Sequence, residues 1–389
     1  MSAPIVIVGS GLAGYTVARE LRKRDSSTPL VMLTDDDGAF YSKPLLSNAL
    51  AKGKSADELV SADCDSMAAQ LNMRILPFSR VVSIEPARHQ LVCEGQRLDY
   101  RALVLALGAE ATTLAIPGID LPGVLSVNTL TDYRPFREQL EVAERVLIMG
   151  AGLIGCEFAN DLLAAGKQVA LVDPLATPLA ALVPERAGQA LATALTQASA
   201  HFHMGRRVAS LALSQGRLQA SLNDGQTTEV DLVLSAVGLT PRTGLARAAG
   251  LRCGRGICTD AQLATSAPDI YALGDCAEVQ GLWQPYVMPL MSAARALADT
   301  LVGQPTALSY PPMPIIVKTP VCPMVALPPP AVAGEWHWQG TGVDLQGEFR
   351  DPQGALRGFV LSGVQVAQRQ ALLKALHYSD NNEQHSALA

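Results

Sequence analysis

The sequence predicts an α/β protein with two Rossmann-like dinucleotide-binding domains and a small mixed α+β domain at the C-terminal end. First, its 389 residues, 49% of them hydrophobic and 17% charged, are enough for two or three domains with large cores. Second, one pattern occurs twice: a run typical of a buried strand, then G-x-G-x-x-G, then an amphipathic helical segment. The glycines are Gly9, Gly11 and Gly14 in the first copy and Gly150, Gly152 and Gly155 in the second.

Each glycine pattern has the context that a dinucleotide site needs. The first glycine makes a tight turn, the second lets a pyrophosphate approach the backbone, and the third lets the helix pack on the strand. A second strand that ends in an acidic residue follows each copy. Asp35 stands 21 residues after Gly14, and Asp173 stands 18 residues after Gly155. A carboxylate about 20 residues on is needed to reach the ribose hydroxyls, so the sequence predicts two dinucleotide sites.

The second site is predicted to prefer NADH to NADPH. The carboxylate of Asp173 would repel a 2′-phosphate, and residues 174–178 contain no arginine that would bind one. Arg186, further along the chain, leaves NADPH open as an alternative.

Composition and cysteine spacing exclude several function classes. A net charge of −6 without a long basic run argues against a general nucleic-acid binder. No apolar stretch reaches the roughly 18 residues that a membrane-spanning helix needs, and residues 5–8 are typical of a first strand rather than a signal peptide. We therefore expect a cytoplasmic protein. The seven cysteines include no Cys-x-x-Cys pair, and His201 and His203 are more typical of a strand than of a metal site, so no metal is expected.

The order of motifs resembles that of flavoprotein reductases with two dinucleotide sites, over nearly the whole chain. Residues 103–108, 231–241 and 270–277 are similar to the two strands that connect the domains of these proteins and to their second FAD motif. The resemblance implies an FAD domain formed by residues 1–113 and 243–310, and an NADH domain formed by residues 114–242, with a helix around residues 131–142. Residues 311–389 would form a small domain that helps to cover the flavin, with a frayed end.

Within that superfamily the chain looks most like the bacterial NADH:rubredoxin reductases. The similar segments are residues 40–47, 152–161, 286–291 and 314–320. The resemblance implies hydride transfer from NADH to FAD, then single-electron transfer to rubredoxin for uses such as alkane hydroxylation or defence against oxidative stress. A ferredoxin reductase of an oxygenase system, a reductase of a rubredoxin-containing flavoprotein, and a redox sensor without turnover stay open as alternatives. The oligomeric state expected is a monomer.

Residue roles follow from this resemblance. Residues 42–47 contain no thiol, unlike the matching segment of disulfide reductases, so electrons should leave from the flavin itself. Lys43 is expected near flavin N5, paired with Glu157, and these two are the candidate catalytic residues. Lys318 is expected near the pyrimidine end of the flavin, although an aliphatic stem packed on a strand is an equal alternative. A helix that starts near Pro289 is expected to direct its N-terminus at the flavin.

The candidate cofactor-binding residues form one larger set. They are Gly9, Ser10, Gly11, Leu12, Ala13, Gly14, Leu33, Thr34, Asp35, Lys43, Pro44, Val82, Gly108, Gly150, Gly152, Leu153, Ile154, Gly155, Glu157, Asp173, Gly238, Gly274, Asp275, Val287 and Lys318.

Overall fold

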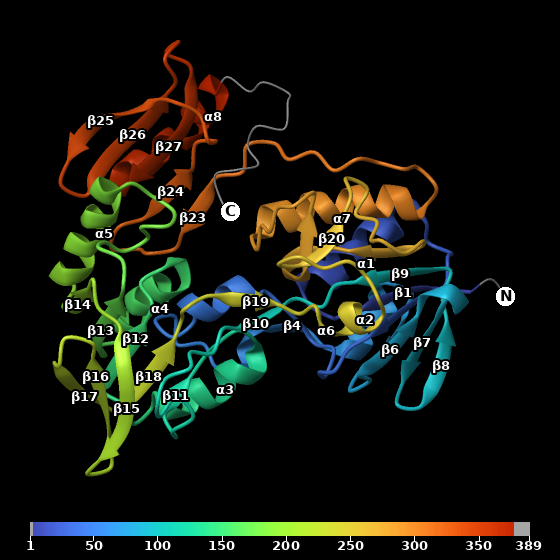
Figure 1. Ribbon diagram of the computed structural model, residues 1–389, viewed down its shortest axis with the longest axis horizontal. Coiled ribbons are helices and arrows are strands. Elements are labelled where there is room, and N and C mark those ends of the chain that lie inside the picture. Colours follow the sequence, from blue (N-terminus) through green and yellow to red (C-terminus); the bar gives the residue numbers. More distant parts are fainter. Residues whose placement is uncertain (1–2, 377–389) are drawn as a thin grey trace.

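The computed structural model describes residues 3–376, in which the three largest sheets have five strands each: two are parallel and one is antiparallel. The parallel sheets lie at opposite ends of an elongated molecule, and the antiparallel sheet packs beside the second of them (Figure 1). Residues 377–389, where the frayed end was expected, lie outside the described residues.

The first parallel sheet follows the first glycine pattern. Its strand order is β21 (Ile270–Ala272), β9 (Ala102–Leu105), β1 (Ile5–Val8), β2 (Leu30–Leu33) and β5 (Arg74–Leu76). Every residue of β1, β2 and β9 is buried, as expected for a parallel sheet covered on both faces. Helices α1 (Leu12–Arg24) and α7 (Val287–Leu301) pack against each other beside it (Figure 1). The antiparallel strands β6 (Val81–Glu85), β7 (Gln90–Cys93) and β8 (Gln96–Asp99) contribute to the same core.

Smaller elements complete this part of the chain. They are β3 (Phe40–Tyr41), the 3₁₀ segments η1 (Lys43–Asn48) and η2 (Asp57–Leu59), β4 (Val60–Ala62), α2 (Cys64–Gln70), η3 (Pro86–Arg88), α6 (Gly244–Ala248), β20 (Ile257–Thr259), η4 (Gly274–Cys276) and β22 (Ala277–Val279).

The second parallel sheet follows the second glycine pattern. Its strand order is β11 (Val124–Leu125), β18 (Leu232–Ser235), β12 (Arg145–Met149), β13 (Gln168–Asp173) and β14 (Ala200–Met204), with helices α3 (Leu130–Gln139), α4 (Leu153–Ala164) and α5 (Glu185–Gln197). A small antiparallel sheet of β15 (Val208–Ser214), β16 (Arg217–Leu222) and β17 (Thr227–Val230) adjoins it. The helix expected around residues 131–142 begins at Leu130, because Thr129 and Asp132 form a capping box there.

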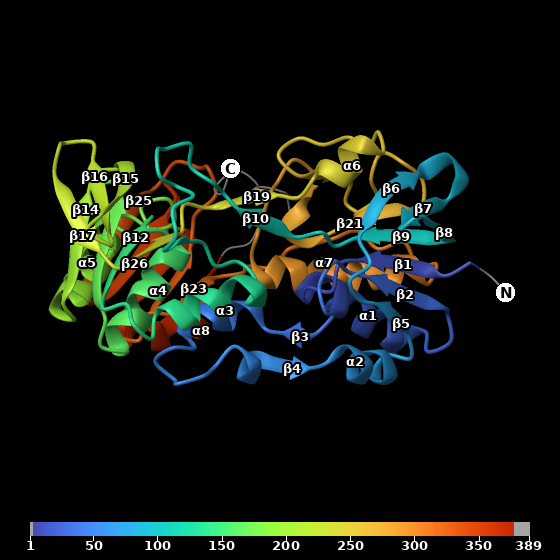
Figure 2. The ribbon, with the colours of Figure 1, turned by 90° about the horizontal axis from the view of Figure 1, so that it is seen from below.

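A two-stranded ribbon connects the two parallel sheets. Strands β10 (Ala109–Ala111) and β19 (Leu239–Pro241) pair antiparallel in the middle of the molecule (Figure 2). The chain leaves the first sheet after β9, enters the second through β10, and returns through β19 before β21. The second sheet is therefore built from chain that interrupts the first.

The C-terminal residues form the antiparallel sheet. Its strand order is β23 (Ile315–Val317), β24 (Met324–Leu327), β27 (Leu356–Ser362), β26 (Asp344–Arg350) and β25 (Glu335–Thr341), followed by η5 (Gly363–Gln368) and α8 (Arg369–Ala375). This sheet packs against α5, and Val317, Met324 and Val360 share one core with the second parallel sheet. Strands β23, β24 and β27 all contribute to the wall of the cavity described below, through Ile315 and Ile316, Leu327, and Arg357 respectively. The domain therefore adjoins the cavity as expected, and its cover of the flavin stays a prediction.

No helix among residues 3–376 is long and apolar enough to cross a membrane.

Candidate functional site

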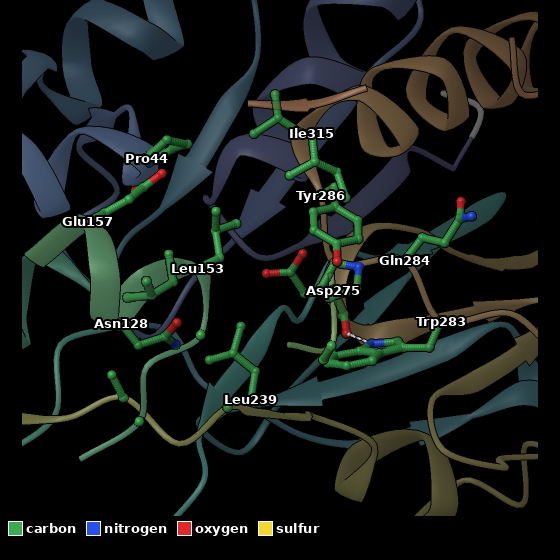
Figure 3. Close-up of a pocket in the computed structure, with 18 of the residues that line it drawn as sticks. Pro44, Asn128, Leu153, Glu157, Leu239, Asp275, Trp283, Gln284, Tyr286 and Ile315 are labelled. Carbon is green, nitrogen blue, oxygen red and sulfur yellow. Dashed lines mark hydrogen bonds between the residues drawn. The ribbon is translucent and has the colours of Figure 1, made fainter. Parts of the chain in front are cut away.

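One cavity of about 1560 Å³ connects the two glycine loops, which we define as residues 9–14 and 150–155. Gly11, Leu12 and Ala13 line it from the first loop, and Gly150, Gly152 and Leu153 from the second. The C-terminal part of the chain also lines it, through residues 314–316 and 318 and through Leu327, Pro328, Pro330 and Arg357. Figure 3 shows Ile315 at this wall. The volume exceeds the range of about 300–1,000 Å³ that is typical of a site for one small ligand. The cavity therefore has room for more than one nucleotide cofactor.

The glycines leave space where a pyrophosphate would approach. A Cβ atom at Gly14 would lie 2.0 Å from the carbonyl oxygen of Gly9, and one at Gly155 would lie 2.0 Å from that of Gly150. The helix after each loop can approach its strand this closely only without a side chain. A Cβ at Gly11 or Gly152 would meet nothing within 4 Å. Backbone amides at the starts of α1 and α4 therefore face open space that suits an anion.

An acidic residue lies against each glycine loop, but the first is not the one expected. Asp173 Oδ2 accepts a hydrogen bond from the amide of Ala151 (2.7 Å). At the first loop the corresponding carboxylate is that of Asp36, which accepts from Ser10 Oγ (2.8 Å) and Thr34 Oγ1 (2.6 Å). Asp35 is exposed, because β2 ends at Leu33 and the chain turns before Asp36. Sequence reasoning missed these contacts of Asp36, although three consecutive aspartates mark the place, and the role of Asp35 toward a ribose stays a prediction.

Arg186 does not approach Asp173. Its guanidinium carbon lies 5.2 Å from the ring centre of Trp338, and Nη2 donates to the carbonyl oxygen of Gly340 (3.4 Å). The guanidinium is therefore directed toward the C-terminal sheet, so Arg186 is not placed to bind the 2′-phosphate of NADPH beside Asp173.

Glu157 forms a buried ion pair with Lys318, not with Lys43 as expected. Only 1% of Glu157 is exposed, and its Oε2 lies 2.9 Å from Lys318 Nζ. Oε2 also accepts from Ser47 Oγ (2.6 Å), and Oε1 accepts from the backbone amide of Lys318 (3.0 Å). Lys318 Nζ further donates to Ser47 Oγ (3.0 Å) and to the carbonyl oxygen of Pro44. This network joins α4, η1 and β23 at one wall of the cavity.

Lys43 pairs instead with Asp275. Lys43 Nζ lies 3.6 Å from Asp275 Oδ2, and both residues line the cavity. The correction has a geometric reason: Lys43 and Ser47 occupy opposite ends of η1, and Ser47 takes the place beside Glu157. Burial lowers the pKa of Lys43 below its usual value of 10.5, while the Asp275 carboxylate opposes that shift.

Asp275 is held by its neighbours. Trp283 Nε1 donates to the backbone carbonyl of Asp275 (2.8 Å; Figure 3), and the guanidinium of Arg255 stacks 4.0 Å from the ring centre of Trp283. A Cβ at Gly274 would lie 2.9 Å from that of Ala13, so only glycine lets Asp275 come this close to the first glycine loop.

Two buried polar atoms in the cavity wall have no partner. Ser235 Oγ and Gln284 Oε1 are buried without a hydrogen bond, and both residues line the cavity. Such atoms are costly unless something binds to them. Helix α7 begins at Val287 without a side-chain cap, and Val287, Met288 and Pro289 also line the cavity. Together with the open space at the glycines, these groups fit bound dinucleotides.

Most of the predicted cofactor residues come together in this cavity. Those that line it are Gly11, Leu12, Ala13, Lys43, Pro44, Gly108, Gly150, Gly152, Leu153, Ile154, Glu157, Asp173, Gly238, Asp275, Val287 and Lys318. Gly9, Gly14, Gly155 and Gly274 act through the close backbone approaches described above. Ser10, Leu33, Thr34, Asp35 and Val82 do not line it, and the 59% exposed Val82 stands on β6. Asn128, Ser235, Trp283, Gln284 and Tyr286 line it without having been predicted.

The thiols near the cavity are shielded. Cys156 Sγ donates to the carbonyl oxygen of Ala151 (3.2 Å), and burial raises the pKa of this thiol far above its usual range. None of the seven cysteines is in a disulfide, and among residues 3–376 no cluster of three His, Cys, Asp or Glu side chains is arranged for a metal.

Comparison with known proteins identifies the same two parts of the chain. Residues 3–298 match the family model of pyridine nucleotide-disulphide oxidoreductases, and residues 307–376 match that of the rubredoxin binding C-terminal domain. The chain is 47% identical to a rubredoxin-NAD(+) reductase of Alcanivorax borkumensis (96% of this chain, 98% of the relative). It is 38% identical to a nitric oxide reductase FlRd-NAD(+) reductase of Vibrio vulnificus (98% and 100%). Among solved structures, a ferredoxin reductase from Rhodopseudomonas palustris is similar with a TM-score of 0.89 at 26% identity (100% and 98%).

Proposed function

The chain belongs to the pyridine nucleotide-disulphide oxidoreductase family, and on that premise we propose that it is an FAD enzyme that takes electrons from NADH and passes them singly to rubredoxin. One observation carries the acceptor: the rubredoxin binding domain matched at residues 307–376 borders, through β23, the cavity that joins the two glycine loops. Rubredoxin-NAD(+) reductases 47% and 44% identical over nearly the full length support the same conclusion.

The cofactors divide between the two loops. We assign FAD to the loop of residues 9–14, together with Asp275 and the start of α7, and NADH to the loop of residues 150–155, together with Asp173. FAD held there would supply an acceptor for the hydride of NADH and a donor of single electrons, which suits an iron carrier. The backbone amides of both loops bind the pyrophosphates, and the Asp173 carboxylate disfavours a 2′-phosphate.

Two lysines supply positive charge in the cavity. An ammonium favours an electron-rich reduced flavin, because opposite charges attract strongly where water is largely excluded. Lys43 and Lys318 are the candidates, each oriented by a carboxylate, Asp275 and Glu157 respectively. The buried Cys156 thiol offers no thiolate beside the second loop, so the outgoing electrons leave from the flavin rather than through a dithiol.

The domain division is part of the proposal. We assign residues 1–113 and 243–310 to the FAD domain, residues 114–242 to the NADH domain and residues 311–389 to a small C-terminal domain that helps to cover the flavin, in a cytoplasmic protein. Two continuous parallel sheets, each with its own glycine loop, support this division. The use of the electrons for alkane hydroxylation or for defence against oxidative stress stays a prediction.

A ferredoxin reductase is the second candidate. The similarity to the Rhodopseudomonas palustris structure favours it, but at 26% identity this is weaker support than that of the rubredoxin reductases.

An anaerobic titration tests the proposed electron path. One equivalent of NADH should bleach the flavin absorbance, and two equivalents of oxidised rubredoxin should restore it, because each iron accepts one electron. A flavin that stays oxidised with NADH would contradict the proposal at its first step, and a reduced flavin that ignores rubredoxin would contradict the acceptor.

A further inference from the structure

Helix α4 carries three buried polar side chains on one face. Glu157, Asn160 and Asp161 stand three and four residues apart, a spacing that puts them side by side on a helix. They are 1%, 5% and 3% exposed. Buried carboxylates and amides destabilise a protein unless they are hydrogen bonded, so each needs a specific partner.

The three side chains bind two segments from outside their own sheet. Asp161 Oδ2 accepts from the amide of Leu50 and Oδ1 from the amide of Ala51, both at 2.9 Å. Asn160 Oδ1 accepts from the amide of Val321 (3.2 Å), which follows β23. Glu157 binds Ser47 and Lys318, as described above. Helix α4 therefore joins residues 47–51 of the first part of the chain to residues 318–321 of the last.

Residues 47–51 directly continue the segment that carries Lys43. Segment η1 begins at Lys43 and ends at Asn48, two residues before Leu50. Helix α4 begins at Leu153, within the second glycine loop. A rigid helix thus fixes the loop assigned to NADH at one of its ends and the Lys43 segment along its side.

We infer that Asp161 is a positioning residue for hydride transfer, holding the second glycine loop and the Lys43 segment at a fixed distance. This inference rests on the proposed function and deepens it. Asp161 is four residues beyond Glu157 and is not among the residues that line the cavity, so we assign its effect to its hydrogen bonds with the two amides. Hydride transfer needs close alignment of donor and acceptor, and a misplacement of 1 Å can lower such a rate about 100-fold.

The substitution Asp161→Asn tests this. The amide group keeps one oxygen for one backbone amide but places an NH₂ against the other, so one of the two bonds is replaced by a repulsive contact. We expect the limiting rate of flavin reduction by NADH, measured anaerobically in a stopped-flow instrument, to fall about tenfold or more. The absorbance spectrum of the flavin should be unchanged. The apparent NADH dissociation constant and the rate at which rubredoxin oxidises chemically reduced flavin should stay within twofold of the wild-type values.

Asp231→Asn is the matched control. The Asp231 carboxylate also binds two consecutive backbone amides: its Oδ2 accepts from those of Glu144 and Arg145, at 3.0 and 2.9 Å. Its Oδ1 accepts from the Arg145 guanidinium (3.3 Å), and all these contacts lie beside the second sheet. The control should leave the limiting rate within twofold. A similar rate loss in both variants, or none in Asp161→Asn, would overturn the inference.

Hydrogen exchange of the unaltered holoenzyme gives a second readout that does not depend on a variant folding. The amides of Leu50 and Ala51 should exchange at least about tenfold more slowly than that of Lys52, the next residue in the same turn. Equal exchange would mean that Asp161 does not hold this segment, and would overturn the inference. If rubredoxin is not the acceptor, the NADH half-reaction and the exchange measurement still decide the role of Asp161, so the two failures are distinguishable.

Discussion

Removing the ammonium of Lys318 should destabilise the protein more than removing both charges of its ion pair. In Lys318→Met the Glu157 carboxylate, 1% exposed, keeps the donors Ser47 Oγ and the backbone amide at position 318 but loses its counter-charge. Breaking a buried pair costs about 3–5 kcal/mol. The two remaining donors place the expected loss of unfolding free energy at about 3 kcal/mol, the lower end of that range.

The double variant Glu157→Gln/Lys318→Met should lose only about 1 kcal/mol, because no uncompensated charge stays buried. We would measure urea unfolding of the wild type, both single variants and the double variant, each with the same saturating FAD, so that cofactor binding contributes equally. The three losses then give the coupling energy of the pair. Losses that add to within about 0.5 kcal/mol would refute the pairing of Glu157 with Lys318.

Three further predictions test the cavity. Burial lowers the pKa of Lys43 below 10.5, so its ammonium is lost at a lower pH than that of an exposed lysine. The rate of flavin reduction should therefore fall as the pH rises through that pKa. The variant Lys43→Arg keeps its charge, so this fall at high pH should disappear from its pH profile. A fall that persists in the variant would exclude Lys43 as its source. Asp173→Ala should raise kcat/KM for NADPH relative to NADH by about tenfold in steady-state assays, and an unchanged ratio would place the discrimination elsewhere. Gly155→Ala puts a methyl group 2.0 Å from a carbonyl oxygen, so titrations should show NADH binding weakened at least about tenfold with the FAD content unchanged. The corresponding variant of the first loop, Gly14→Ala, should purify with little FAD. Equal effects of the two variants on FAD content would contradict the assignment of the loops.

The local part of the site could be predicted from the sequence. The tight turn, the close approach of a pyrophosphate and the packing of the helix on the strand all depend on the six residues of the glycine pattern. The glycine loops could therefore be located from that pattern alone. The parallel sheets follow from strands and helices that alternate around those loops. Asp36 shows the limit of this reasoning. The pattern placed the carboxylate of Asp35 at the first loop, but the chain turns after β2 and brings the carboxylate of Asp36 to Ser10 instead.

Contacts between distant segments could not be predicted in the same way. The pair of Glu157 and Lys318 joins residues 161 positions apart, and it depends on how the C-terminal sheet packs on α5. The resemblance suggested Lys43 as the partner, since both segments approach the cavity, but which lysine reaches the carboxylate is decided by tertiary packing. Asn160 and Asp161 did leave a signal, because two polar residues beside Glu157 in a largely apolar helix need partners from elsewhere.

The most direct test of the electron path compares two acceptors in steady-state NADH oxidation. Purified rubredoxin and a plant-type ferredoxin would be supplied at equal concentrations, with NADH saturating. We expect turnover with rubredoxin to be at least about tenfold faster, because the C-terminal sheet beside the cavity belongs to a rubredoxin binding domain. Faster turnover with ferredoxin, or no turnover with either although FAD is bound, would contradict this account.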